Sequence, residues 1–197
     1  MKKNVMIAAL AALTFLCIGE LSAQTSTSKS QAKVETTVTV GGEAMYPKKN
    51  IVENAVNSKD HTTLVAAVKA AGLVETLQGK GPFTVFAPVN NAFEDLPEGT
   101  VETLLKPENK GTLTTVLTYH VVAGKLDFNA IAAEIKKGNG KATLKTVSGG
   151  TLTAMMNGAR NIQVKDEAGN IANISTYDVY QSNGVIHVVD KVLLPKM

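Results

Sequence analysis

The stretch FTVFAPVNNAF, residues 83–93, gives the clearest indication of the fold. Its first part, 83–87, is a short run of apolar and β-branched residues, which is typical of a buried strand. Pro88 has no backbone N–H to donate to a sheet, and it ends the strand. The residues after it indicate the start of a helix. This stretch therefore joins a buried strand directly to helical sequence.

Apolar residues at helical spacing dominate the first half of the chain on both sides of this stretch. Before it, Thr62 or Thr63 is placed to cap a helix that ends at Gly72, a residue suited to the left-handed conformation of a helix C-terminus. After it, Thr100 and Asp127 are expected to cap two further helices. We predict helices over 50–57, 64–71, 101–105, from residue 107 onward, and over 128–137.

The second half of the chain changes to the alternating pattern of strands. Turn-forming residues separate the alternating segments, and the first three of these linkers favour hairpins. We predict strands over 142–148, 151–157, 161–166, 171–181 and 185–194. Helices thus segregate to the first half and a mainly antiparallel meander to the second. The predicted class is α+β, with helices packed on an antiparallel sheet or wedge, and a doubly wound fold is disfavoured.

The N-terminus has the pattern of an export signal. Two lysines precede an apolar run over 5–18, which is shorter than the roughly 20 residues that cross a bilayer. We predict a secretory signal peptide at 1–23 and no stable membrane span after its removal. The only cysteine, Cys17, is then lost, so no disulfide is expected. The segment 24–44 is expected to be a flexible leader, and 45–197 the folded domain.

Composition argues against most kinds of chemistry. A net charge of +3 with mixed signs does not favour nucleic-acid binding. The only arginine is Arg160, so arginine clamps on phosphate or carboxylate groups are not expected. The three histidines lack zinc spacing, and neither a nucleophile elbow nor a phosphate-binding glycine loop is present. We therefore predict no metal, no cofactor and no enzymatic activity. His61, just before a helix, is expected to be a solvated residue.

Two further stretches of sequence contain motifs that go together with the stretch at 83–93. Residues 117–122 read LTYHVV and 183–195 read NGVIHVVDKVLLP. In this order and spacing, the three stretches resemble the two boxes and the Tyr-His motif of the fasciclin domain family, and the resemblance covers about 50–195. The residues that we assign to the structural motif are Thr84, Phe86, Pro88, Asn90, Phe93, His187 and Asp190.

The resemblance implies a wedge of about seven strands with several helices. It also implies a role in adhesion and in contacts with the extracellular matrix or the cell surface, without general enzymatic chemistry. A single domain behind a signal peptide is similar to small bacterial secreted members. In the family, the Tyr-His motif is implicated in receptor binding, so Tyr119 and His120 are candidate partner-binding residues. The alternative for this pair is a structural hinge between helix and strand.

Alternation along the last predicted strand places His187 and Asp190 on opposite faces, where they would not pair. We expect His120 and His187 to be partly buried and hydrogen-bonded to the backbone, because an unpaired buried imidazole costs about 1–3 kcal/mol. Asp190 is expected to accept backbone N–H groups and so to fix the end of the strand.

The leading hypothesis is an exported, non-catalytic binding module for cell adhesion or contacts with the matrix or cell surface. Its expected partner is a cell-surface or matrix protein or polysaccharide, and the protein is expected to be a monomer. It would be secreted or held at the cell surface, with the periplasm as an alternative location. A second hypothesis is a soluble carrier of a small apolar ligand in a cleft between helices and sheet. A third is a hydrolase with an unrecognised site.

One position departs from the family pattern and gives a first prediction. The residue after Pro88 is commonly threonine in the family, and here it is Val89, which cannot accept a backbone N–H at the helix start. Asn90 is expected to take over this cap. Val89→Thr should therefore raise the free energy of unfolding by roughly 0.5–1 kcal/mol in urea denaturation. An unchanged or lower stability would count against it.

Overall fold

The computed structural model describes residues 37–196, so the predicted signal peptide and the leader up to residue 36 lie outside the described residues. Seven α-helices and nine strands are found in this range. The strands are β1 (Val38–Val40), β2 (Glu43–Met45), β3 (Phe83–Pro88), β4 (Val121–Ala123), β5 (Lys141–Lys145), β6 (Thr151–Asn157), β7 (Asn161–Lys165), β8 (Ile171–Gln181) and β9 (Gly184–Val189). The helices are α1 (Ile51–Ala55), α2 (Thr62–Ala71), α3 (Val74–Gln78), α4 (Asn90–Glu94), α5 (Thr100–Leu105), α6 (Lys110–Tyr119) and α7 (Phe128–Lys137). The predicted α+β class is confirmed.

The main sheet has seven strands in the order β4-β3-β9-β8-β7-β6-β5. The predicted meander is confirmed, because β5 to β9 pair in sequence order and antiparallel. The one parallel pair joins β3 to β9, from Phe83 opposite Gly184 to Pro88 opposite Val189. The two edges of the sheet approach each other where Val122 after α6 bridges to Thr146 after β5.

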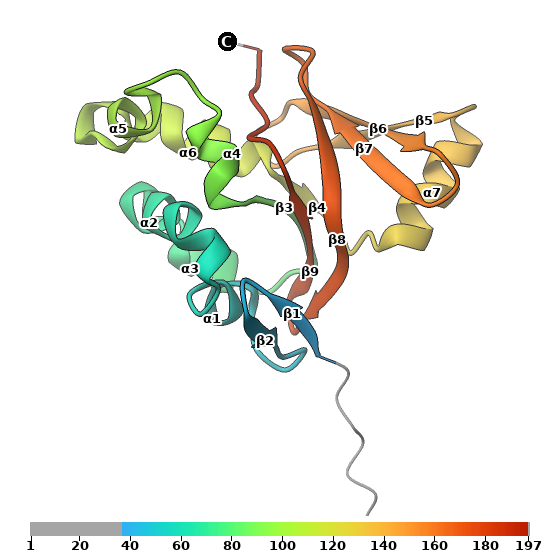
Figure 1. Cartoon of the computed structure of the whole chain (residues 1–197), viewed down its shortest axis with the longest axis horizontal. Helices are drawn as coiled ribbons and strands as arrows, with labels where there is room; N and C mark the ends of the chain where they lie inside the picture. The colour runs from blue at the N-terminus through green and yellow to red at the C-terminus, as the bar shows by residue number, and fades with distance from the viewer. Residues whose placement is uncertain (1–36, 197) are drawn as a thin grey trace, which may run out of the picture. The chain divides into compact units, whose positions relative to one another are not determined.

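The strands β3 and β9 are buried on both faces and separate two hydrophobic cores. Figure 1 shows α1 to α6 on one side of these strands, and β5 to β7 with α7 on the other. On β3, Val85 and Ala87 belong to the core under the helices, whereas Phe86 belongs to the core under α7. β9 divides in the same way, with Ile186 on the helical side and Val189 on the other. Each strand therefore serves two cores at once.

The folded part of the chain begins before the expected boundary at residue 45. The strands β1 and β2 form a hairpin through the left-handed Gly41 and Gly42. Val40 and Met45 from this hairpin are buried in the core under the helices. The end of the segment 24–44, expected as leader, is thus ordered because its valines bury apolar area there.

The last strand is shorter than predicted and ends at Val189 instead of residue 194. Asp190 still donates its N–H to the Asn173 carbonyl of β8, but the N–H groups of Leu193 and Leu194 bond to side chains. The N–H of Leu193 donates to His120 Nε2 at 2.9 Å, and that of Leu194 donates to Asp166 Oδ2 at 2.9 Å. These bonds satisfy the buried chain without a ladder.

Three expected helix caps were wrong, and the side chain of Asn90 explains two of them. α4 begins at Asn90 itself, with Val89 as an N-cap residue that makes no side-chain bond. The Asn90 side chain caps α2 instead, because its Oδ1 accepts from the Thr63 N–H at 3.1 Å and its Nδ2 donates to the Lys59 carbonyl at 2.8 Å. Thr62 and Thr63 lie inside α2, so neither is its cap.

Thr100 likewise lies inside α5, which Gly99 precedes as the N-cap residue. The predicted Asp127 cap of α7 is confirmed, since its side chain accepts from the Ala130 N–H at 2.9 Å. None of the helices among residues 37–196 is long and apolar enough to cross a membrane.

The cap that Asn90 supplies across the fold gives a second prediction. Asn90→Ala should lower the free energy of unfolding by about 1–2 kcal/mol, because the first turn of α2 and the Lys59 carbonyl lose their partner. The matched control is Asn91→Ala, next to it on the exposed side of the same helix. Equal effects of the two variants in urea denaturation would contradict this role of Asn90.

Candidate functional site

The three sequence stretches meet at the centre of the main sheet. β3 lies between β9 and β4, and β4 directly follows the Tyr119-His120 pair. The Phe86 N–H donates to the His120 carbonyl at 2.9 Å. On its other side, Phe86 is in register with His187, and their rings stack with centroids 5.7 Å apart.

Tyr119 is completely buried at the end of α6. Its hydroxyl donates to the Thr151 carbonyl at 2.7 Å and accepts from the Glu167 N–H at 3.0 Å. Burial raises the pKa of Tyr119 to about 12, so the phenol is neutral at pH 7. Gly150 lies so close that an added Cβ would be 2.7 Å from the ring. Tyr119 thus fixes the start of β6 and the turn after β7.

His120 is buried beside Tyr119, and backbone groups engage both of its ring nitrogens. Nδ1 donates to the Val116 carbonyl at 2.8 Å, and Nε2 accepts from the Leu193 N–H at 2.9 Å. This pattern fixes the tautomer, because an N–H can only donate. Burial lowers the pKa of His120 to about 4. His120 is therefore neutral at pH 7, and it ties the C-terminal segment to α6.

Neither candidate partner-binding residue reaches the surface, since Tyr119 is 0% and His120 3% exposed. A partner on the surface would not touch these side chains. This geometry agrees with the alternative that the pair is a structural hinge between helix and strand. A direct role of the pair in partner binding stays a prediction. The pair instead holds exposed segments in place: the turn at 147–150, the turn at 166–170 and the C-terminal residues 194–196.

Two acidic residues complete this network, and the sequence analysis missed both. Asp166 is buried and accepts from the N–H groups of Asn170 and Leu194, at 2.8 and 2.9 Å. Glu167 is exposed and accepts from the Thr151 N–H at 2.9 Å. The spacing of Asp166 and Asn170 around a glycine turn is the local signal that could have indicated the first of these contacts.

The remaining motif residues fix the backbone around β3 and β9. Thr84 Oγ1 donates to the Gly124 carbonyl at 2.7 Å and accepts from the Leu126 N–H at 2.8 Å. His187 Nε2 donates to the Leu126 carbonyl at 2.8 Å, so Thr84 and His187 hold the same loop. Burial lowers the pKa of His187, which keeps it neutral.

Asp190 and His187 do not pair in the structure. Asp190 accepts from both the backbone N–H and the side-chain amide of Asn173, each at 2.7 Å. Pro88 is the last residue of β3 and is buried. Phe93 is half-buried against the helical core.

These contacts give the two motif histidines, His120 and His187, structural partners. His120 and His187 use their ring nitrogens on backbone groups, so neither is free to move a proton. No group of three or more histidine, cysteine, aspartate or glutamate side chains in residues 37–196 could hold a metal ion.

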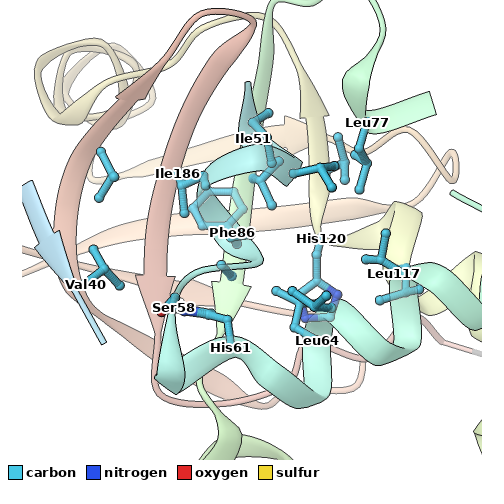
Figure 2. Close-up of a pocket in the computed structure, with 18 of the residues that line it drawn as sticks. Val40, Ile51, Ser58, His61, Leu64, Leu77, Phe86, Leu117, His120 and Ile186 are labelled. Carbon is cyan, nitrogen blue, oxygen red and sulfur yellow. Dashed lines mark hydrogen bonds between the residues drawn. The ribbon is translucent and has the colours of Figure 1, made fainter. Parts of the chain in front are cut away.

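A small apolar cavity lies between the helices and β3, and His120 of this network is one of its lining residues. Its volume is about 60 Å³. Figure 2 shows that side chains from the helices and from the sheet line it together. Lining residues include Ile51, Leu64, Val68, Leu77, Val85 and Ile186.

His61 lines the same cavity, and the expectation that it is solvated was wrong. It is only 3% exposed, because the turn before α2 directs it inward. Its Nδ1 lies 2.9 Å from Ser58 Oγ, while Nε2 has no hydrogen-bond partner among the described residues. Burial lowers the pKa of His61, so the ring is neutral at pH 7.

The pKa of His120 gives a third prediction. Below about pH 6.5 the unfolded chain takes up a proton at this residue, whereas the folded chain does so only near pH 4. The free energy of unfolding should therefore fall as the pH drops through this window, with His120 contributing about 1.4 kcal/mol per pH unit where the dependence is steepest. Urea denaturation between pH 4.5 and 7.5 measures it. His120→Gln should show a shallower dependence, and an unchanged dependence would refute the assignment.

Comparison with known proteins agrees with this geometry. The model of the fasciclin domain family matches residues 59–195. Protein sll1483 of Synechocystis is 43% identical to this chain, over 100% of both chains. The cell surface glycolipoprotein MPB83 of Mycobacterium bovis is 34% identical, over 79% of this chain and 64% of its own length.

Among solved structures, a FAS1 domain pair from the insect cell adhesion molecule fasciclin I is similar, with a TM-score of 0.65 and 16% identity. The match covers 82% of this chain and 58% of that chain, and it shows the shared fold. The family match, the identity to relatives and the convergence of the three motifs lead to one conclusion: this chain belongs to the fasciclin domain family.

Proposed function

We propose that this protein is a non-catalytic adhesion module that contacts a partner at the cell surface or in the extracellular matrix. The observation that carries the proposal is the burial of the Tyr119-His120 pair, whose side-chain polar atoms all bond to backbone groups, three of them in segments distant in sequence. The pair therefore has a structural role, because it holds the surrounding segments in place. Family membership supports the same function, as do the names of a relative and of a structurally similar protein, which refer to the cell surface and to cell adhesion.

The contact face on this proposal consists of the exposed segments that the pair holds, 147–150, 166–170 and 194–196. Val147, which is 48% exposed, lies in the first of them. Ile171, also exposed, directly follows the second. Exposed apolar side chains on fixed turns suit a contact surface, because little conformational freedom is lost when a partner binds.

The partner on this proposal is a cell-surface or matrix protein or polysaccharide. The protein acts as a monomer after export, with 1–23 as its signal peptide and the residues that follow as a tether. It is released or held at the cell surface, with the periplasm as the alternative location.

A fourth prediction tests the scaffold role with two tyrosines. Tyr119→Phe keeps the ring but removes the hydroxyl that holds Thr151 and Glu167. Tyr177→Phe is the matched control, because its hydroxyl also bonds to a backbone N–H, that of Ile162 at 2.7 Å, away from the proposed face. We expect Tyr119→Phe to weaken binding to intact cells or matrix several-fold, while Tyr177→Phe retains it.

Binding of the purified, fluorescently labelled protein to the surface of its own cells measures the effect, with thermal denaturation of each variant as a check on folding. Equal binding by both variants would contradict the proposed face. Failure of the wild-type protein to bind any native surface at micromolar concentration would contradict the adhesion function itself.

A second candidate function, carrying a small apolar ligand, is favoured by one specific observation. The cavity between the helices and β3 is lined mostly by apolar side chains, and one of its lining residues, His61, has a buried ring nitrogen without a hydrogen-bond partner among residues 37–196. The hydrolase hypothesis has less support, because the ring nitrogens of His120 and His187 are engaged by the backbone and the Ser58-His61 pair is buried.

A further inference from the structure

The cavity between the helices and β3 has one polar feature that its apolar wall does not explain. His61 Nε2 is buried there without a hydrogen-bond partner among residues 37–196. Burial lowers the pKa of His61 and the backbone of Ala87 partly opposes this shift, yet no hydrogen bond of normal geometry joins Ala87 to Nε2. Buried polar atoms of folded proteins are nearly always paired, so an exception calls for an explanation.

The contact with Ser58 indicates which nitrogen carries the proton. Ser58 Oγ is buried and lies 2.9 Å from His61 Nδ1. A buried hydroxyl needs an acceptor for its proton, and His61 Nδ1 is the atom that lies within hydrogen-bond distance of Ser58 Oγ. Nδ1 then accepts, and the neutral ring carries its proton on Nε2. His61 therefore supplies one N–H donor that no hydrogen bond within residues 37–196 occupies, in a mostly apolar wall.

Other polar groups around the cavity do not compete with this donor. His120 also lines it, but backbone groups occupy both of its ring nitrogens. Lys69 is the charged side chain of the lining and is exposed, so its ammonium group stays in water. Figure 2 shows His61 next to Ser58, with Leu64 and His120 nearby.

Volume and wall limit what the cavity can take. A group the size of a water molecule needs roughly 10–15 Å³ of cavity volume. The cavity of about 60 Å³ therefore admits about four to six non-hydrogen atoms. A charged group would lose its hydration without a buried counter-charge, and such a group is therefore disfavoured.

We propose that this cavity binds a short, uncharged ligand with an apolar body and one acceptor oxygen, the class of small ketones, alcohols and esters. Nε2–H of His61 donates to that oxygen, and the side chains of α1, α2 and β3 surround the carbon atoms. This inference rests on the second candidate function, which it deepens by naming the ligand class and the residue that selects it.

The test compares two probes of one shape on the whole protein. 2-Butanone carries the acceptor oxygen, and 2-methyl-1-butene has a methylene group in its place. Methyl-labelled isoleucine, leucine and valine report on cavity residues such as Ile51, Leu64 and Ile186. Nitrogen-15 labels on the histidine rings report on His61, while His187 serves as the internal control because it does not line the cavity and its Nε2 is bonded to the Leu126 carbonyl.

We expect both probes to shift the cavity methyl signals, with the ketone bound about fivefold more tightly, the factor that a net hydrogen bond of about 1 kcal/mol gives. Only the ketone should shift the signal of His61 Nε2, and the signals of His187 should stay unchanged. In His61→Phe the preference for the ketone should disappear. The wild-type nitrogen signal keeps the test decisive if this variant does not fold.

The two ideas fail in different ways. If neither probe shifts the cavity methyl signals, as for a cavity that only holds water, the carrier function and the ligand class are both overturned. If both probes bind equally tightly and the nitrogen signal of His61 does not shift, the ligand class is overturned, while the carrier function stands.

Discussion

The parallel pairing of β3 with β9 is the constraint on which the rest of the structure depends. Both strands are buried on both faces, so each supplies side chains to the core under α1 to α6 and to the core under α7. The pair also places Phe86 between the His120 backbone and the His187 ring. If this pairing were lost, both cores would open together and the three motifs would separate. We therefore regard the motifs as parts of one central element.

This position explains why the polar motif residues are structural. Around a strand that is buried on both faces, every polar group needs a protein partner, because water cannot supply one. Thr84, His120 and His187 meet this need by bonding to backbone groups of segments that are distant in sequence. These buried hydrogen bonds hold the exposed turns in place. The proposed adhesion face therefore depends on residues that a bound partner would not contact. His61 differs, because its second nitrogen has no such partner within the described chain.

Much of the fold could be predicted from local patterns, and what could not be predicted depends on distant contacts. β6 and β8 have the bounds that alternation and turn residues predict, and Asp127 caps α7 as expected. The parallel partner of β3 lies about a hundred positions away, and no local pattern indicates it. Asn90 was given the wrong helix for the same reason, since its partners belong to the turn before α2. The burial of His61 likewise depends on the way the helices pack against β3.

The central claim is that a buried scaffold presents the turns at 147–150 and 166–170 as a contact face. Site-specific photocrosslinking on intact cells tests it most directly, with the crosslinker placed at Val147 or at Val56. These two residues are equally accessible, 48% and 47% exposed, but Val56 lies at the end of α1, outside the proposed face. We predict that Val147 captures a discrete cell-surface partner and that Val56 does not. Capture from Val56 alone, or equally from both positions, would contradict the account.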